Sequence, residues 1–482
     1  MAAAEGVQFS LKVMMIKESN KVLYAEVDSD FADVLLSFLT LPLGTIVRLL
    51  IKHYGNFAPI LGSLNSLYAG LQNMDDSHFW TEEGKLMLLN PRNSSEIECS
   101  KLKIQIDDTP PTQYFVCSNS RCASLYYSVK CICPKLSNPL TSYKKDVEVE
   151  ADCGDKGVFA EQTASFILTD DFQLLTNSPA SILRILRLNG IKDTNVVEER
   201  TLAVGLKEIM ELLKGSLVSM TPITDIVFSM SSAREKTKRF CARAKNESDF
   251  SWQARSTDQN IVSVCKKITV TVFVQKSSNR VLLAQTRHDF IDFIFSLLTI
   301  PLGRVLFLLG CNSCLGSIYN LYGSILNLKN SDYMKSREKS TKLLEPQIPT
   351  HFLSSYQIFP LDQQITLFQR HRSVGIEYKY FVSPTTTIGC CMRLIDPKGH
   401  DSFVKGPTLF IVTEDLVVYA AASTSIISTL NKMKIPVSDV EEHDLVIGME
   451  EALSILKASL TSTCALSEGL KPFLKSRSKQ EL

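Results

Sequence analysis

The sequence has almost no net charge. Its 482 residues include 52 lysines and arginines against 51 aspartates and glutamates, which leaves a formal charge of +1 at pH 7. A chain with so little net charge generates no global field that would attract nucleic acid or an anionic membrane surface. We therefore expect no nucleic-acid partner. A protein partner stays open at this point, and so does the oligomeric state.

The sequence also lacks the short motifs that mark common cofactor sites. It contains neither GxGxxG nor GxxxxGK[ST], the glycine-rich patterns that bring backbone amides close to phosphates. Its seven histidines are scattered, and none stands at an equivalent place in both copies of the repeat described below. We therefore predict no catalytic and no cofactor-binding residues, and we favour a protein that is not an enzyme.

The first residues, MAAAEGVQFSLK, lack the apolar run of a secretory signal. The thirteen cysteines are odd in number and irregularly spaced, which favours reduced thiols in the cytoplasm or the nucleus. One stretch, 305–328, is uncharged and long enough to cross a bilayer, but its counterpart in the first copy contains Arg48, Lys52 and His53. We therefore expect buried helices there and no membrane span.

What the sequence does contain is a long internal repeat. Residues 30–44 read DFADVLLSFLTLPLG and residues 289–303 read DFIDFIFSLLTIPLG, with nine of fifteen positions identical and the other six apolar in both. We interpret the chain as two homologous domains, each large enough to close a core of its own and to fold independently. The predicted boundaries are 7–228 for the first copy, 229–260 for a polar, basic linker, 261–470 for the second copy and 471–482 for a flexible tail.

Local patterns predict the same order of elements in both copies, and the fold class that follows is α+β. Each half is expected to be a β-hairpin plus covering helices followed by a second strand pair and helices. Alternating apolar and β-branched residues predict the hairpin strands at 9–16, 22–27, 268–275 and 281–286. Asp30 is expected to cap the first covering helix, with Asp33 in its first turn rather than in a catalytic pair. Pro42 and Pro301 predict a bend into a second helix.

Five blocks of the sequence carry a resemblance to a known family. They are Val-Leu-Tyr-Ala-Glu at 22–26, the repeated block at 30–44, Gly-Ser-Leu-x-x-Leu-Tyr at 62–68, Phe-Ile-Leu-Thr-Asp-Asp at 166–171 and the acidic, leucine-rich segment at 198–214. With these blocks the chain resembles a plant-specific family known only as a domain of unknown function, number 674. The resemblance covers nearly the whole chain outside the linker. It implies a plant protein and carries over no activity and no catalytic residues.

The sharpest candidate for chemistry is a group of four cysteines, Cys117, Cys122, Cys131 and Cys133. Four thiolates close to a hairpin suit tetrahedral zinc, so a structural zinc ion is the one cofactor that the sequence suggests. The spacing matches no standard zinc ribbon, however, and the second copy has Ser383 in place of the first cysteine. We therefore favour ordinary buried thiols over a zinc site.

Three functional hypotheses remain after these observations. The first is a non-catalytic interaction or regulatory protein, because the two copies share apolar framework and helix caps rather than reactive groups. The second is an enzyme with one active and one decayed half, which a pocket holding a histidine beside a thiol or a carboxylate would favour. The third is a zinc-stapled binding module in the first half.

Metal analysis separates the third hypothesis from the others. We expect reduced protein, freshly purified without chelator, to contain no stoichiometric zinc. About one zinc per chain, lost in a Cys122→Ser variant, would instead establish the four-thiolate site and contradict our assignment of these residues as buried thiols.

Overall fold

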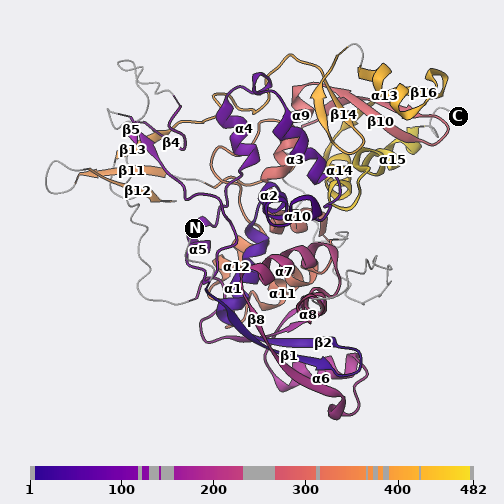
Figure 1. Cartoon of the computed structure of the whole chain (residues 1–482). Coiled ribbons are helices and arrows are strands. Elements are labelled where there is room, and N and C mark those ends of the chain that lie inside the picture. Colours follow the sequence, from indigo (N-terminus) through magenta and orange to yellow (C-terminus); the bar gives the residue numbers. More distant parts are fainter. Residues whose placement is uncertain are drawn as a thin grey trace.

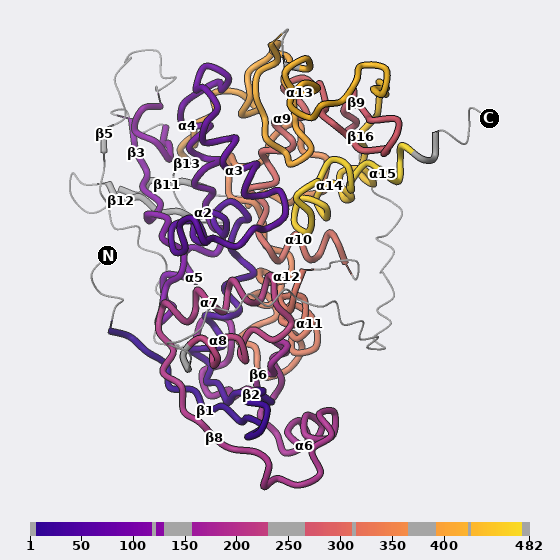
Figure 2. Tube along the Cα trace, turned by 45° about the vertical axis from the view of Figure 1, so that its right-hand side comes forward, coloured from indigo at the N-terminus to yellow at the C-terminus, as the bar shows by residue number. Residues whose placement is uncertain are grey.

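The computed structural model describes ten stretches of the chain. They are residues 6–117, 122–129, 141–142, 157–231, 266–310, 315–364, 367–372, 378–383, 390–422 and 425–477. The predicted fold class is confirmed: the described residues form an α+β structure with helices and three sheets. Figures 1 and 2 show two of these sheets at opposite ends of the molecule, with helices packed between them.

The first sheet contains the predicted hairpin of the first half. Its strand order is β7-β6-β2-β1-β8, and all neighbours are antiparallel. The strands are β1 (Phe9–Ile16), β2 (Lys21–Asp28), β6 (Ser165–Thr169), β7 (Leu174–Thr176) and β8 (Val197–Val204). Alternate residues of β1 are buried, because one face of the strand packs on the core and the other does not.

The second sheet has the corresponding order, β15-β14-β10-β9-β16. Its strands are β9 (Ile268–Gln275), β10 (Arg280–Thr286), β14 (Phe410–Thr413), β15 (Val418–Ala420) and β16 (Val440–Ile447). In each sheet the hairpin is central, a later strand pair extends one side and a long strand closes the other. A common origin of the two halves stays a prediction from the sequence repeat.

The helices also follow one another in corresponding order. In the first half they are α1 (Ser29–Ser37), α2 (Leu43–Tyr54), α3 (Leu64–Asn73), α4 (Glu82–Leu89), α5 (Glu96–Cys99), α6 (Pro179–Leu188), α7 (Leu206–Val218) and α8 (Pro222–Ser231). In the second half they are α9 (His288–Ser296), α10 (Leu302–Leu309), α11 (Ile318–Leu328), α12 (Arg337–Leu344), α13 (Ser425–Met433), α14 (Met449–Thr461) and α15 (Ala465–Arg477). No helix among the described residues is long and apolar enough to cross a membrane.

The start of α1 differs from the prediction by two residues. Asp28, not Asp30, is the N-cap, and its carboxylate accepts a hydrogen bond of 2.8 Å from the amide of Phe31. Asp28 ends strand β2 in an extended conformation, which places its side chain over the first free amides of the helix. The bend after α1 is confirmed, because Pro42 is extended and α2 starts at the next residue.

The two halves exchange helices. The loop before α3 lies on the second half, where the amide of Ser63 donates to the carbonyl of Ser459 in α14. In the corresponding place, the amide of Ser317 donates to the carbonyl of Ser219, just after α7. As a result, α3 lies against β15 at the edge of the second sheet and α11 lies against β7 at the edge of the first, and Figure 1 shows α3 close to the second sheet. Each half thus contributes a helix to the edge of the other half's sheet.

The repeated block forms the point where the halves cross. The amide of Leu43 donates to the carbonyl of Ile300 at 3.0 Å, and the amide of Leu302 donates to the carbonyl of Leu41 at 2.9 Å. Pro42 and Pro301 therefore face each other in an antiparallel bridge, and Leu-Pro-Leu-Gly of the first copy packs against Ile-Pro-Leu-Gly of the second.

Close approach of backbones explains why glycine follows the Pro-Leu dipeptide in both copies. A Cβ atom on Gly44 would lie 3.0 Å from the carbonyl oxygen of Leu298. A Cβ on Gly303 would overlap the carbonyl oxygen of Leu343 and would lie 3.1 Å from that of Leu39. Only a residue without a side chain lets the backbones come this near.

One hydrophobic core therefore serves both halves. A single cluster of buried side chains runs from strand β1 through the crossing to helix α15 and includes Leu39 and Leu298, both completely buried. We therefore predict that the halves do not fold independently, and their division into two domains stays a prediction from the sequence. The physical reason is that the crossing, α3 and α11 bury apolar side chains against the other half, and separation of the halves would expose these side chains to water.

A third sheet also joins the halves. Its order is β12-β11-β13-β4-β3-β5, with β3 (Phe115–Val116), β4 (Cys122–Ser124) and β5 (Thr141–Ser142) from the first half. The other strands, β11 (Leu367–Arg372), β12 (Tyr378–Ser383) and β13 (Cys390–Leu394), come from the second half. The junction is the parallel pair β4 and β13, with Arg393 opposite Cys122 and Leu394 opposite Ala123.

The shared core predicts that cutting the chain once does not separate the halves. We expect protein cleaved at a site-specific protease site placed between residues 231 and 266 to elute from gel filtration as one particle. The two fragments should separate only in denaturant. Elution of two separate, folded fragments in plain buffer would contradict the shared core.

A pair of glycine variants tests the crossing itself. Gly44→Ala should weaken the association of the cleaved fragments, because the added methyl group would press on the carbonyl oxygen of Leu298 in the other half, 3.0 Å away. Gly323→Ala is the matched control, since nothing lies within 4 Å of a Cβ at that position in α11. Equal behaviour of the two variants would show that the crossing tolerates a side chain.

Candidate functional site

The structure brings two of the four predicted zinc ligands together. Cys117 follows β3 and Cys122 begins β4, and both side chains are buried. The amide of Cys117 donates to the carbonyl of Cys122 at 3.0 Å, and the amide of Cys122 donates to the Cys117 sulfur at 3.3 Å. Cys131 and Cys133 lie outside the described residues. Within the described part of the chain, no group of three or more metal-ligating side chains is close enough to hold an ion, so the zinc site stays a prediction.

Asp33 ties helix α1 to a loop of its own half. Its carboxylate accepts three backbone hydrogen bonds, from Val158 at 2.7 Å, Phe159 at 2.9 Å and Ala160 at 2.7 Å. Burial raises the pKa of Asp33 to about 6, although the three amides favour the charged form. Both carboxylate oxygens already accept backbone hydrogen bonds, so this aspartate anchors a loop.

Asp292 occupies the corresponding place in α9 with one difference. It accepts backbone hydrogen bonds from Phe403 and Val404 on one carboxylate oxygen, whereas the other oxygen accepts from the hydroxyl of Ser354. It is completely buried, and burial raises its pKa to about 6. Asp292 is therefore an anchor as well, but it holds one backbone amide fewer than Asp33.

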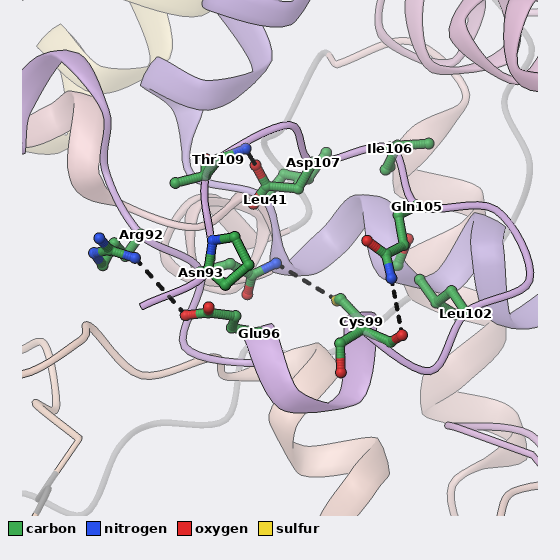
Figure 3. A pocket seen from close by; sticks show the side chains of 13 residues that line it. Leu41, Arg92, Asn93, Glu96, Cys99, Leu102, Gln105, Ile106, Asp107 and Thr109 are labelled. Carbon is green, nitrogen blue, oxygen red and sulfur yellow. Dashed lines mark hydrogen bonds and ion pairs between the residues drawn. The ribbon is translucent and has the colours of Figure 1, made fainter. Parts of the chain in front are cut away.

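A small cavity of about 90 Å³ lies in the first half next to α5. Figure 3 shows its polar lining, in which Arg92 faces Glu96 and the side-chain amide of Asn93 points toward the sulfur of Cys99 at 3.6 Å. Burial raises the pKa of the Cys99 thiol to about 12, so the thiolate is scarcely populated at neutral pH. A cavity of this size holds a few water molecules rather than a metabolite, and its thiol is unreactive.

A second, much larger pocket of about 690 Å³ opens where the two halves meet. It lies at the carboxyl ends of the parallel strands β4 and β13, since Ser128 and Val129 follow the first strand and residues 395–401 follow the second. Loops that a sheet holds in place commonly carry binding residues. Its volume is in the range of pockets that bind small molecules.

The exchange of helices places the start of α4 in the lining of this pocket. Thr81 and Glu83, at the start of α4, belong to the first half, yet they line the pocket with second-half residues. The hydroxyl of Thr81 donates to the carbonyl of Pro397 at 2.9 Å and accepts from the amide of Gly84 at 3.0 Å. One hydroxyl thus fixes both the start of α4 and the loop after β13.

His351, in the loop after α12, lines the same pocket under unusual constraints. Its backbone has φ +69°, a left-handed conformation that is uncommon for residues other than glycine. Its Nδ1 lies 3.5 Å from a carboxylate oxygen of Asp396. Its Nε2 is buried and has no hydrogen-bond partner among the described residues, a situation that costs about 1–3 kcal/mol for a polar group. Strain and an unsatisfied nitrogen in one residue are typical of functional sites.

A buried lysine holds Asp396 and His351 in place. Lys398 is only 1% exposed, and its ammonium lies 2.9 Å from Asp396 while it also donates to the backbone carbonyl of His351. Burial opposes ionisation of Asp396, but the contacts with His351 and Lys398 outweigh burial and lower its pKa below the usual value. The carboxylate is therefore charged at neutral pH, and its charge is matched by Lys398.

Further polar and charged side chains complete the lining of the pocket. The hydroxyl of Ser128 donates to Glu83, and the exposed side chains of Arg393 and Asp401 also line the pocket. His400 lines it as well and stacks on Trp80, with ring centroids 3.7 Å apart.

The comparison with protein families identifies the chain. The family model described as "Protein of unknown function (DUF674)" matches residues 5–450. The chain belongs to this DUF674 family. No curated protein and no solved structure matches it. The family match carries no activity, so the function of this DUF674 member has to be argued from the pocket itself.

Sequence reasoning missed every polar residue of the pocket. The histidines were compared between the copies, but the pocket is built once, from unlike parts of the two halves. Asp396, Lys398 and His400 are close together in the sequence, and a charged cluster after a strand is the signal that could have drawn attention to them. His351 is 45 residues away from Asp396, and no local pattern links the two.

The two anchoring aspartates generate a paired prediction. In Asp33→Asn the new amide group faces the Val158 amide, so one buried donor loses its acceptor. In Asp292→Asn the retained oxygen can keep both backbone amides, and the new amide can donate to Ser354. We expect Asp33→Asn to lower the free energy of unfolding by about 1–3 kcal/mol more than Asp292→Asn. Denaturant unfolding measures both, and an equal or reversed order would contradict the assigned contacts.

Proposed function

We propose that this DUF674 protein binds a small polar molecule in the pocket between its halves. One observation carries the proposal: the pocket of about 690 Å³ is walled by polar side chains from both halves at the ends of two parallel strands. Ligand sites occur preferentially at interfaces between the parts of a protein. The role is that of a binding or regulatory protein, in line with the shared, non-catalytic framework of the two halves.

The net charge and the cysteine content bear on the partner and the cellular compartment of this protein. A net charge of +1 argues against nucleic acid as the partner, and the odd, irregular set of thirteen cysteines fits a reducing compartment. We therefore place the protein in the cytoplasm or the nucleus, where a protein partner would bind its ligand-bound state.

Ligand-dependent stabilisation tests the proposal. Thermal unfolding is measured with fractions of a metabolite extract, for the wild type and for Arg393→Gln. A ligand at one hundred times its dissociation constant stabilises a protein by about 2.7 kcal/mol, which is readily detected. We expect at least one fraction to raise the unfolding temperature of the wild type and to have a much smaller effect on the variant.

The control is Arg184→Gln, which removes an exposed arginine on α6, outside the pocket-lining residues. It should respond like the wild type. If no fraction distinguishes Arg393→Gln from Arg184→Gln, the pocket is not a binding site and the proposal is wrong.

A second candidate function is acid–base catalysis in the same pocket. It is favoured by His351 beside the Asp396 carboxylate, which is the pattern that an active second half would show. In that case the protein converts the ligand that the thermal-unfolding test identifies, and His351→Gln lowers the turnover rate far more than the affinity. Recovery of the ligand unchanged after incubation with wild-type protein would exclude this candidate.

A further inference from the structure

The chemistry of the pocket wall indicates what kind of molecule fits it. The charge of Asp396 is already matched by Lys398, so this pair adds no net charge to the wall. Two carboxylates remain, those of Glu83 and Asp401, together with one guanidinium, that of Arg393. An anionic ligand would meet the two carboxylates, and a cationic ligand would meet the guanidinium.

A hydroxyl group is complementary to such a mixed wall, because it donates one hydrogen bond and accepts others. It can donate to Glu83 or Asp401 and accept from Arg393 without burying a net charge. Several hydroxyls on one small molecule would satisfy these groups together.

The rest of the lining suits a molecule that also has apolar C–H faces. Val129, Leu394, Ile395 and Pro397 contribute apolar surface, and His400 contributes an aromatic ring supported by Trp80. Flat aromatic and aliphatic surfaces pack well against the C–H groups of a ring, while the carboxylates and the guanidinium take its hydroxyls.

We infer that the ligand is an uncharged, ring-shaped polyhydroxylated molecule, a monosaccharide or a cyclitol. This inference rests on the proposed binding function and names the ligand class for the same pocket. Recognition is shared by both halves, with Glu83 from the first and Arg393 from the second.

The test compares matched probes by saturation-transfer NMR and calorimetric titration of the full-length protein. The neutral probes are D-glucose, D-galactose and myo-inositol, and the charged counterparts are glucose 6-phosphate, which is anionic, and glucosamine, which is cationic. We expect at least one neutral probe to bind at least tenfold more tightly than the charged probes.

Two variants show whether binding uses the pocket. Glu83→Gln and Arg393→Gln should each weaken the binding of that neutral probe at least tenfold, because each loses a charged hydrogen-bonding partner. Glu82→Gln is the matched control, since Glu82 is the preceding, exposed residue of α4 and does not line the pocket. It should bind the probe like the wild type.

The outcomes distinguish a wrong ligand class from a wrong binding function. If a charged probe binds more tightly than its neutral counterpart, or if a pocket-dependent ligand from the metabolite extract carries no ring of hydroxyls, the inference on ligand class is wrong while the binding function stands. If neither the probes nor the extract show binding that depends on Arg393, both are overturned.

Discussion

Two backbone hydrogen bonds at the centre of the molecule determine the rest of its architecture. They join Leu43 to Ile300 and Leu302 to Leu41, and they hold segments 41–44 and 300–303 against each other. Each proline turns the chain toward the other half, where α3 reaches the edge strand β15 and α11 reaches the edge strand β7. The repeat is strongest at this point because the same close contact has to be made twice, with glycine in both places.

The candidate pocket is a consequence of this crossing. Because α4 is carried over to the second half, Thr81 and Glu83 stand beside the loop that follows β13. The parallel pairing of β4 with β13 brings Ser128 to the same place. Neither half alone contains all of these pocket-lining residues. A function located here belongs to the whole chain, so its residues need not recur in each copy.

Much of the local structure could be predicted from the sequence, and the long-range arrangement could not. Alternation in 9–16 and 268–275 indicates strands, and the prolines mark the bend, because these signals are local. The cap at Asp28 rather than Asp30 shows how such signals miss boundaries by two residues. An apolar helix face does not say which sheet it covers, so the exchange of α3 and α11 was not predictable. The pairing of His351 with Asp396 depends on that same tertiary arrangement.

Hydrogen exchange measured by mass spectrometry at increasing denaturant tests the central claim, that the halves share one cooperative core. The informative peptides are 38–50 and 297–309, which carry the crossing amides of the first and the second half. The account predicts that both open with the same free energy, equal to that of global unfolding, because neither segment can leave without the other. Opening of one peptide at low denaturant while the other stays protected would contradict it.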